Sequence, residues 1–163
     1  MSENTVIRSD LRPGDLGRIV TLHGEGYAGE EGGFGLAFEA FVARTLADFV
    51  IDNKAQGRIW LAERGAALLG CAAMVDRGDR GQLRWVIVAP SARGEGLGKR
   101  LVEKAMIYAA AKNWSEVFLE TTSGLSASMD IYLRLGFEVV GEERLTLWHP
   151  HAQTLIRMRK ALA

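Results

Sequence analysis

The chain has 163 residues, 48% of them hydrophobic, which is long and apolar enough for one domain with a real core. Its 20 Lys and Arg residues are balanced by 20 Asp and Glu residues, which argues against nucleic acid as a partner, because phosphate backbones are bound through a basic excess. The single cysteine, Cys71, excludes an internal disulfide and a multi-cysteine metal site; no metal is predicted, and we interpret Cys71 as an inert buried thiol.

The N-terminal segment MSENTVIRSD is polar and lacks the apolar core of a signal peptide. No uncharged apolar run is long enough to span a bilayer. We therefore expect a cytoplasmic protein with no membrane partner, folded as a single domain over residues 1–163.

The chain opens with a predicted strand and helix. Residues 5–8 are expected to form a short edge strand, and residues 16–25 a helix that Asp15 caps. His23 lies near the end of that helix, where the dipole favours a cation, and we interpret it as a surface or packing residue.

A loop, a second helix and a hairpin follow. The glycine-rich residues 24–35 predict a flexible loop, and residues 36–52 a longer helix. Residues 59–63 and 67–75 predict a hairpin. Small side chains at residues 70–73 leave a narrow surface that another layer can approach closely.

The central stretch, LRWVIVAPSARGEGLGKRL (residues 83–101), predicts a strand, a glycine-rich turn and a helix. Alternation places Leu83, Trp85 and Ile87 on one face of the strand, and Pro90 ends it, because proline has no N–H to donate. A helix that begins in a glycine-rich turn presents unpaired N–H groups, which suit a phosphate.

The glycine spacing excludes two common phosphate loops. A Walker A loop needs a glycine at position 93 and Ser or Thr after Lys99, and a Rossmann turn needs a G-x-G-x-x-G spacing. Here Arg93 and Arg100 stand at those Walker positions, and the three glycines at 94, 96 and 98 are each two residues apart.

The remaining residues predict three strands and a short helix. Gly136 is placed to end that helix, and residues 142–153 are expected to form a long hairpin loop. The predicted strands are residues 116–122, 137–141 and 154–160, and the helix is residues 127–135.

Two motifs together resemble the GNAT acetyltransferase superfamily. Arg93-x-x-Gly96-x-Gly98 is similar to its pyrophosphate loop, and Tyr132-x-x-x-Gly136-Phe137 is similar to the signature that ends its acetyl-CoA site. The opening segment is similar to acetyltransferase domains fused behind MarR-type regulators, of which this chain would be the free-standing form.

The resemblance implies an α/β fold: a mixed, mostly antiparallel sheet of seven strands, with helices on both faces and a splayed central strand pair. It also implies acetyl-CoA as co-substrate, with its pantetheine arm along residues 86–88 and its pyrophosphate on the N–H groups of residues 93–99. The implied cofactor-binding residues are Val86, Ile87, Val88, Arg93, Gly94, Glu95, Gly96, Leu97, Gly98 and Lys99.

The chemistry of acetyl transfer needs an acid, a base and an oxyanion donor. The resemblance assigns Tyr132 as the acid that protonates the leaving thiolate, and the backbone N–H of Val88 as the oxyanion donor. Glu120 is the candidate base, with His149, His151 or a water chain as alternatives.

Two positions depart from the family pattern. Leu125 replaces an asparagine that contacts the cofactor in many relatives, and Gln82 replaces a glutamate and cannot act as a base. The expected reaction is acetylation of a primary amine, with a small molecule as the first candidate acceptor. A protein N-acetyltransferase and a non-catalytic acyl-CoA sensor stay open, and a homodimer is plausible by analogy.

Overall fold

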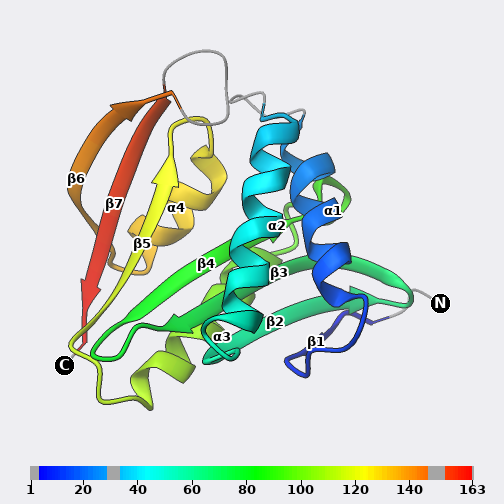
Figure 1. Cartoon of the computed structure of the whole chain (residues 1–163), viewed down its shortest axis with the longest axis horizontal. Coiled ribbons are helices and arrows are strands. Elements are labelled where there is room, and N and C mark those ends of the chain that lie inside the picture. Colours follow the sequence, from blue (N-terminus) through cyan, green and yellow to red (C-terminus); the bar gives the residue numbers. More distant parts are fainter. Residues whose placement is uncertain (1–3, 29–33, 147–152, 163) are drawn as a thin grey trace.

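The computed structural model describes residues 4–28, 34–146 and 153–162, whose strands form one sheet in the order β1-β2-β3-β4-β5-β7-β6 (Figure 1). The strands are β1 (Val6–Arg8), β2 (Gly57–Arg64), β3 (Ala67–Asp76), β4 (Gly81–Val88), β5 (Glu116–Thr122), β6 (Glu138–Leu145) and β7 (Gln153–Ala161). The α-helices are α1 (Asp15–Ala28), α2 (Leu36–Ile51), α3 (Leu97–Ala110) and α4 (Ser126–Arg134), with a 3-10 turn at Pro90–Ala92.

The sheet is antiparallel except where β4 meets β5. These two strands run parallel and pair only at Gly81 with Val117 and Gln82 with Phe118. Beyond those pairs they diverge, as Figure 1 shows. The predicted seven-stranded mixed sheet with a splayed central pair is therefore confirmed.

Helices cover both faces of the sheet, and each face buries its own apolar cluster. On one face, Ile19 of α1 and Leu46 of α2 pack with residues such as Leu61. On the other face, Leu101 of α3 packs with Met74 of β3. Each side chain of this size contributes about 1.5–3 kcal/mol when it is fully buried.

Small residues on β3 allow α3 to lie close to the sheet, as the sequence predicts. A Cβ atom at Gly70 would lie 3.1 Å from Cδ1 of Leu101 and 2.8 Å from the carbonyl oxygen of Ile87. The shorter distance, to the backbone of β4, is too close for a real side chain, so the β3–β4 pairing requires glycine here, and the lack of a Cβ also lets Leu101 of α3 pack closely.

A β-bulge at Trp85 makes the predicted alternation of β4 wrong. The pairing with β3 moves from Cys71–Ile87 to Ala73–Arg84, so β4 carries one extra residue, and Trp85 has a φ of 48°. Leu83 consequently packs on the α3 side, whereas Trp85 and Ile87 pack against α1 and α2. A bulge of this kind reverses the face on which later residues lie.

Helix α1 is longer than predicted and takes in residues assigned to the loop. It continues to Ala28 through Gly24 and Gly26. A Cβ at Gly26 would lie 2.9 Å from Cδ1 of Ile87, so glycine here lets the helix approach β4. The hydroxyl of Tyr27, in the last turn, donates to the Val86 carbonyl at 2.8 Å.

Asp15 does not cap α1, contrary to prediction. Its Oδ1 lies 2.7 Å from a guanidinium nitrogen of Arg8, and its Oδ2 accepts the Arg12 N–H at 2.7 Å. The hydrogen bond from Arg8 is the main reason why the pKa of Asp15 is lowered. Arg8 of β1 also pairs with Glu63 of β2. The buried carboxylate of Asp15 therefore holds α1 to β1 directly and to β2 through Arg8.

The C-terminal half follows the predicted order with different limits. Gly136 ends α4 with a φ of 91°, and Phe137 N–H donates to the Tyr132 carbonyl at 3.0 Å, as expected for a C-cap. Strand β6 continues to Leu145, so part of the predicted loop is strand. His149 and His151 lie outside the described residues.

None of the helices in residues 4–28, 34–146 and 153–162 combines the length and apolarity needed to cross a membrane.

Candidate active site

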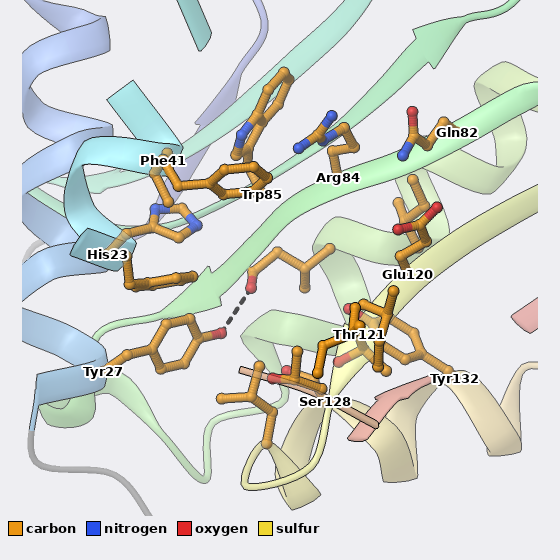
Figure 2. A pocket seen from close by; sticks show the side chains of 18 residues that line it. His23, Tyr27, Phe41, Gln82, Arg84, Trp85, Glu120, Thr121, Ser128 and Tyr132 are labelled. Atoms are coloured by element: carbon orange, nitrogen blue, oxygen red, sulfur yellow. Dashed lines mark hydrogen bonds between the residues drawn. The ribbon is translucent and has the colours of Figure 1, made fainter. Parts of the chain in front are cut away.

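Two cavities adjoin where β4 and β5 diverge. The first, here called the β4–β5 pocket, has a volume of about 440 Å³ and is drawn in Figure 2. The second, here called the glycine-loop pocket, has about 420 Å³ and lies at the start of α3. Tyr27, Leu125 and Ser128 line both, so the two pockets lie side by side along this shared wall.

The three glycines of the loop are required for two different reasons. Gly94 and Gly96 have φ values of 86° and 74°, and a Cβ at either would meet nothing within 4 Å. Their backbone conformation therefore favours glycine, while the space beside them stays open. A Cβ at Gly98 would instead lie 2.9 Å from Cδ1 of Ile131 and 3.3 Å from Cγ2 of Val88, so this glycine permits close packing of α3.

The first turn of α3 has the properties of an anion site. Gly96 is the N-cap and offers no side-chain bond, and the first intrahelical bond runs from Arg100 N–H to the Gly96 carbonyl. The N–H groups at the start of an α-helix have no partner within the helix and carry a partial positive charge. Arg93 and Lys99, both exposed, line the same pocket.

The predicted loop residues do not all offer their side chains. Glu95 lies 3.2 Å from the guanidinium of Arg64 at the end of β2, so its carboxylate is held by that ion pair. Leu97 is buried in the α3-side core. These two residues can therefore serve a ligand only through their backbone groups.

Backbone groups of β4 point in alternate directions. Ala89 N–H donates to the Leu69 carbonyl at 2.7 Å, so the backbone groups of Ala89, and by alternation those of Ile87, face β3. Val86 and Val88, which alternate with them, direct their N–H and C=O groups toward the diverging β5. The Val86 carbonyl already accepts the Tyr27 hydroxyl.

Tyr132 is buried between α4 and the sheet and lines the β4–β5 pocket. Its ring packs edge-on against Phe137, with ring centres 6.1 Å apart. Burial raises the pKa of Tyr132 well above its ordinary value. The phenol therefore stays protonated at neutral pH and is able to donate a proton.

Glu120 projects from β5 into the same pocket as Tyr132 (Figure 2). It is exposed, and it makes no ion pair with any described residue. Its cross-strand neighbour Arg157 instead pairs with Glu143 at 3.1 Å. The structure thus brings both predicted catalytic side chains to one cavity and leaves the carboxylate available.

His23 is a packing residue, one of the two interpretations drawn from the sequence, but α1 continues past it to Ala28 and its place in the pocket wall was missed. His23 is buried beside Tyr27 and Phe38, and its Nδ1 lies 2.9 Å from the Ile19 carbonyl. Burial lowers the pKa of His23 to about 4, so the ring is neutral. Ile19, His23 and Tyr27 are four residues apart, a spacing that indicates a shared face of the helix.

Arg84 is a second residue of this pocket that the sequence did not single out. The guanidinium lies 4.9 Å from the ring centre of Trp85. Because the bulge at Trp85 redirects β4, strand alternation alone could not place Arg84 in the cavity.

Comparison with known proteins supports a single family. The model of the acetyltransferase (GNAT) family matches residues 30–137. N-acetyltransferase 8F1 of Rattus norvegicus is 32% identical over 125 residues, which cover 70% of this chain and 57% of that protein. The chain therefore spans less than two thirds of the length of this relative.

Solved structures share the whole fold at low identity. A GNAT-family protein from Desulfovibrio desulfuricans has a TM-score of 0.78 and 17% identity, with 98% of this chain and 100% of that chain covered. A protein from Salmonella typhimurium, described as an acetyltransferase and solved with its cofactor acetyl-CoA, has a TM-score of 0.74 and 18% identity, with 98% and 95% covered. With the family model matching most of its length, this chain belongs to the acetyltransferase (GNAT) family.

Proposed function

We propose that the protein transfers the acetyl group of acetyl-CoA to a primary amine by direct attack on the thioester. One observation carries this proposal: the anion site at the start of α3 opens beside the cavity that holds Tyr132 and Glu120. A phosphate-bearing cofactor and two proton-transfer groups are what this reaction needs.

The residues of the glycine-loop pocket fit the cofactor. The N–H groups at the start of α3, with Arg93 and Lys99, are suited to its pyrophosphate. Val86 and Val88 line the two pockets, and their backbone groups are suited to the pantetheine amides. The Val86 carbonyl also accepts the Tyr27 hydroxyl, and the Val88 carbonyl accepts Nε of Arg93 at 3.3 Å. Ile87 is left out of this assignment, because its backbone groups, like those of Ala89, face β3 by strand alternation.

Bound acetyl-CoA supplies an activated acetyl group and a thiolate leaving group. Glu120 takes a proton from the ammonium of the acceptor, and the free amine lone pair forms the new N–C bond. The N–H of Val88 stabilises the oxyanion that develops on the carbonyl oxygen. Tyr132 then donates its proton to the sulfur as the C–S bond breaks, and the nitrogen of the new amide returns a proton to the tyrosine, which restores the phenol.

The volume of the β4–β5 pocket favours a small acceptor. Its volume of about 440 Å³ lies in the range typical of small-molecule sites. A protein acceptor and a non-catalytic acyl-CoA sensor are the alternatives. A cytoplasmic location, a homodimer and a relation to MarR-fused domains stay predictions.

Binding of the cofactor is tested first by calorimetry. We expect acetyl-CoA to bind the wild type with micromolar affinity, and ATP and NAD to bind much more weakly. In Gly96→Glu the new carboxylate repels the pyrophosphate, and affinity for acetyl-CoA should fall at least tenfold. Absence of acetyl-CoA binding in the wild type would overturn the proposed function.

Gly78→Glu is the matched control for this experiment. Gly78 also has a positive φ, of 95°, and also has open space beside it, but it lies in the β3–β4 hairpin turn. The control thus introduces the same charge and comparable backbone strain away from both pockets. Equal losses of affinity in the two variants would indicate that strain, rather than the anion site, explains the effect.

The base assignment predicts the behaviour of Glu120→Gln. The amide cannot take a proton, so we expect kcat to fall about 100-fold while acetyl-CoA affinity is unchanged. Raising the pH deprotonates the amine in solution and should recover part of the rate. Glu116→Gln, earlier on the same strand, is the control; an unchanged kcat in Glu120→Gln would assign the proton to water or another group.

A further inference from the structure

Arg84 occupies an unusual position in the β4–β5 pocket. It precedes the bulge residue Trp85 on β4, and Figure 2 shows it beside Trp85, with Glu120 on the other diverging strand. The side chain is partly buried, and its guanidinium lies 4.9 Å from the Trp85 ring centre and 6.0 Å from that of Phe41. Aromatic faces therefore hold the group in place at the pocket wall.

The charge of this guanidinium is not balanced by a nearby acid. No described carboxylate lies within 4 Å of Arg84, in contrast to Arg8 and Arg64, which pair with Asp15 and Glu95. Burial and the neighbouring Arg77 both lower the pKa of Arg84, and Glu120 and Asp48 act on it only across longer distances. A cation removed from water without a counter-ion is costly unless a ligand supplies one.

This position is separate from the phosphate site assigned above. Arg84 lines the β4–β5 pocket and does not line the glycine-loop pocket. The cofactor phosphates are accordingly assigned to the start of α3, whereas an anion at Arg84 would have to belong to the acceptor.

Resting on the proposed function, we propose that the acceptor is a primary amine that also carries a carboxylate, which Arg84 binds. The planar guanidinium donates two parallel N–H bonds to a carboxylate, a geometry that lysine does not offer. Glu120, the other charged side chain among the described residues that line the cavity, faces the ammonium end. Phe41 and Trp85 contact the apolar body of the acceptor.

The test compares amines that differ only in the carboxylate. The full chain, saturated with acetyl-CoA, is assayed for free thiol release with three pairs: L-phenylalanine and 2-phenylethylamine, L-leucine and 3-methylbutylamine, and L-lysine and 1,5-diaminopentane. In at least one pair the amino acid should have a kcat/KM at least tenfold above that of its decarboxylated partner, as expected for a charge-assisted bond.

Substitutions at Arg84 distinguish a loss of carboxylate recognition from a loss of folding. Arg84→Gln should raise the KM of the amino acid tenfold or more, leave its kcat within twofold, and leave the decarboxylated amine unaffected. Arg84→Lys should fall between the wild type and Arg84→Gln. The control is Arg80→Gln, because Arg80 also stacks on a ring, that of Phe118 at 4.1 Å, but does not line the pocket.

Two results would overturn the inference while leaving the cofactor assignment intact. One is equal efficiency within every pair, or equal losses for both members in Arg84→Gln. The other is no turnover of any of the six amines by a protein that binds acetyl-CoA. Failure to bind acetyl-CoA would instead overturn the proposed function, and this inference with it.

Discussion

Replacing Tyr132 by phenylalanine should lower kcat for acetyl transfer by about 100-fold or more, with little change in acetyl-CoA affinity. The phenol lines the β4–β5 pocket together with Glu120, and burial keeps it protonated by raising its pKa, as the proposed acid role requires. General acid catalysis of this kind contributes typically about 100- to 10,000-fold. Steady-state thiol release, together with calorimetry on the same samples, measures both quantities.

Tyr108→Phe provides the control for this substitution. Tyr108 lies on α3, where its ring packs edge-on against Trp60 with ring centres 5.6 Å apart, and it lines neither pocket. Loss of its hydroxyl should leave kcat within twofold. An unchanged kcat in Tyr132→Phe would remove the acid role, and a protein that in addition acetylates no amine would fit the acyl-CoA sensor.

The free energy of unfolding should fall by about 3 kcal/mol between pH 6.5 and pH 4 because of His23. Burial lowers the pKa of this ring from 6.5 to about 4, so the unfolded chain binds a proton in this range and the folded protein does not. The stabilisation is complete above pH 6.5 and is lost as the pH falls toward 4. Each unit of pKa difference corresponds to about 1.4 kcal/mol.

Urea unfolding at pH 7.0, 5.5 and 4.5 measures this effect in the wild type and in His23→Gln. Glutamine keeps an N–H donor for the Ile19 carbonyl but does not titrate, so the variant should lose most of the pH dependence. The carboxylates of Asp15 and Glu63, whose pKa values are lowered by Arg8, lose their contribution only at lower pH, below about 4.5. An equal slope in both proteins would contradict a buried neutral histidine.

Much of the candidate site could be predicted from local sequence. The conformations of Gly94 and Gly96 and the helix that follows depend on residues adjacent in the chain, and α4 with Gly136 is equally local. Hydrophobic periodicity predicts β5 with its observed limits, which places Glu120 on that strand. Tyr132 then lies on α4, the helix that follows β5.

Other features depend on contacts between distant residues. The bulge at Trp85 arises from the pairing of β4 with β3, where the Cys71 thiol donates to the Trp85 carbonyl at 3.0 Å. The extension of α1 through Gly26 depends on Ile87 of β4, and the ion pair of Asp15 with Arg8 depends on the position of β1. Turn and capping preferences near Asp15 and Gly24 cannot contain this information.

The sequence by itself determined the order of the elements and the glycine-rich start of α3, because these follow from short-range periodicity, turn chemistry and capping. The two candidate proton-transfer residues, Tyr132 and Glu120, came instead from the resemblance of their motifs to a known family. Only the tertiary structure decided which side chains meet in the β4–β5 pocket. There one extra residue in β4 reverses the face on which its later side chains lie, and burial among α1, α2 and β4 makes His23 neutral. The fold also leaves Arg84 with no carboxylate of the described residues within ion-pair distance. Those outcomes come from long-range packing and desolvation, which act only once the chain is folded.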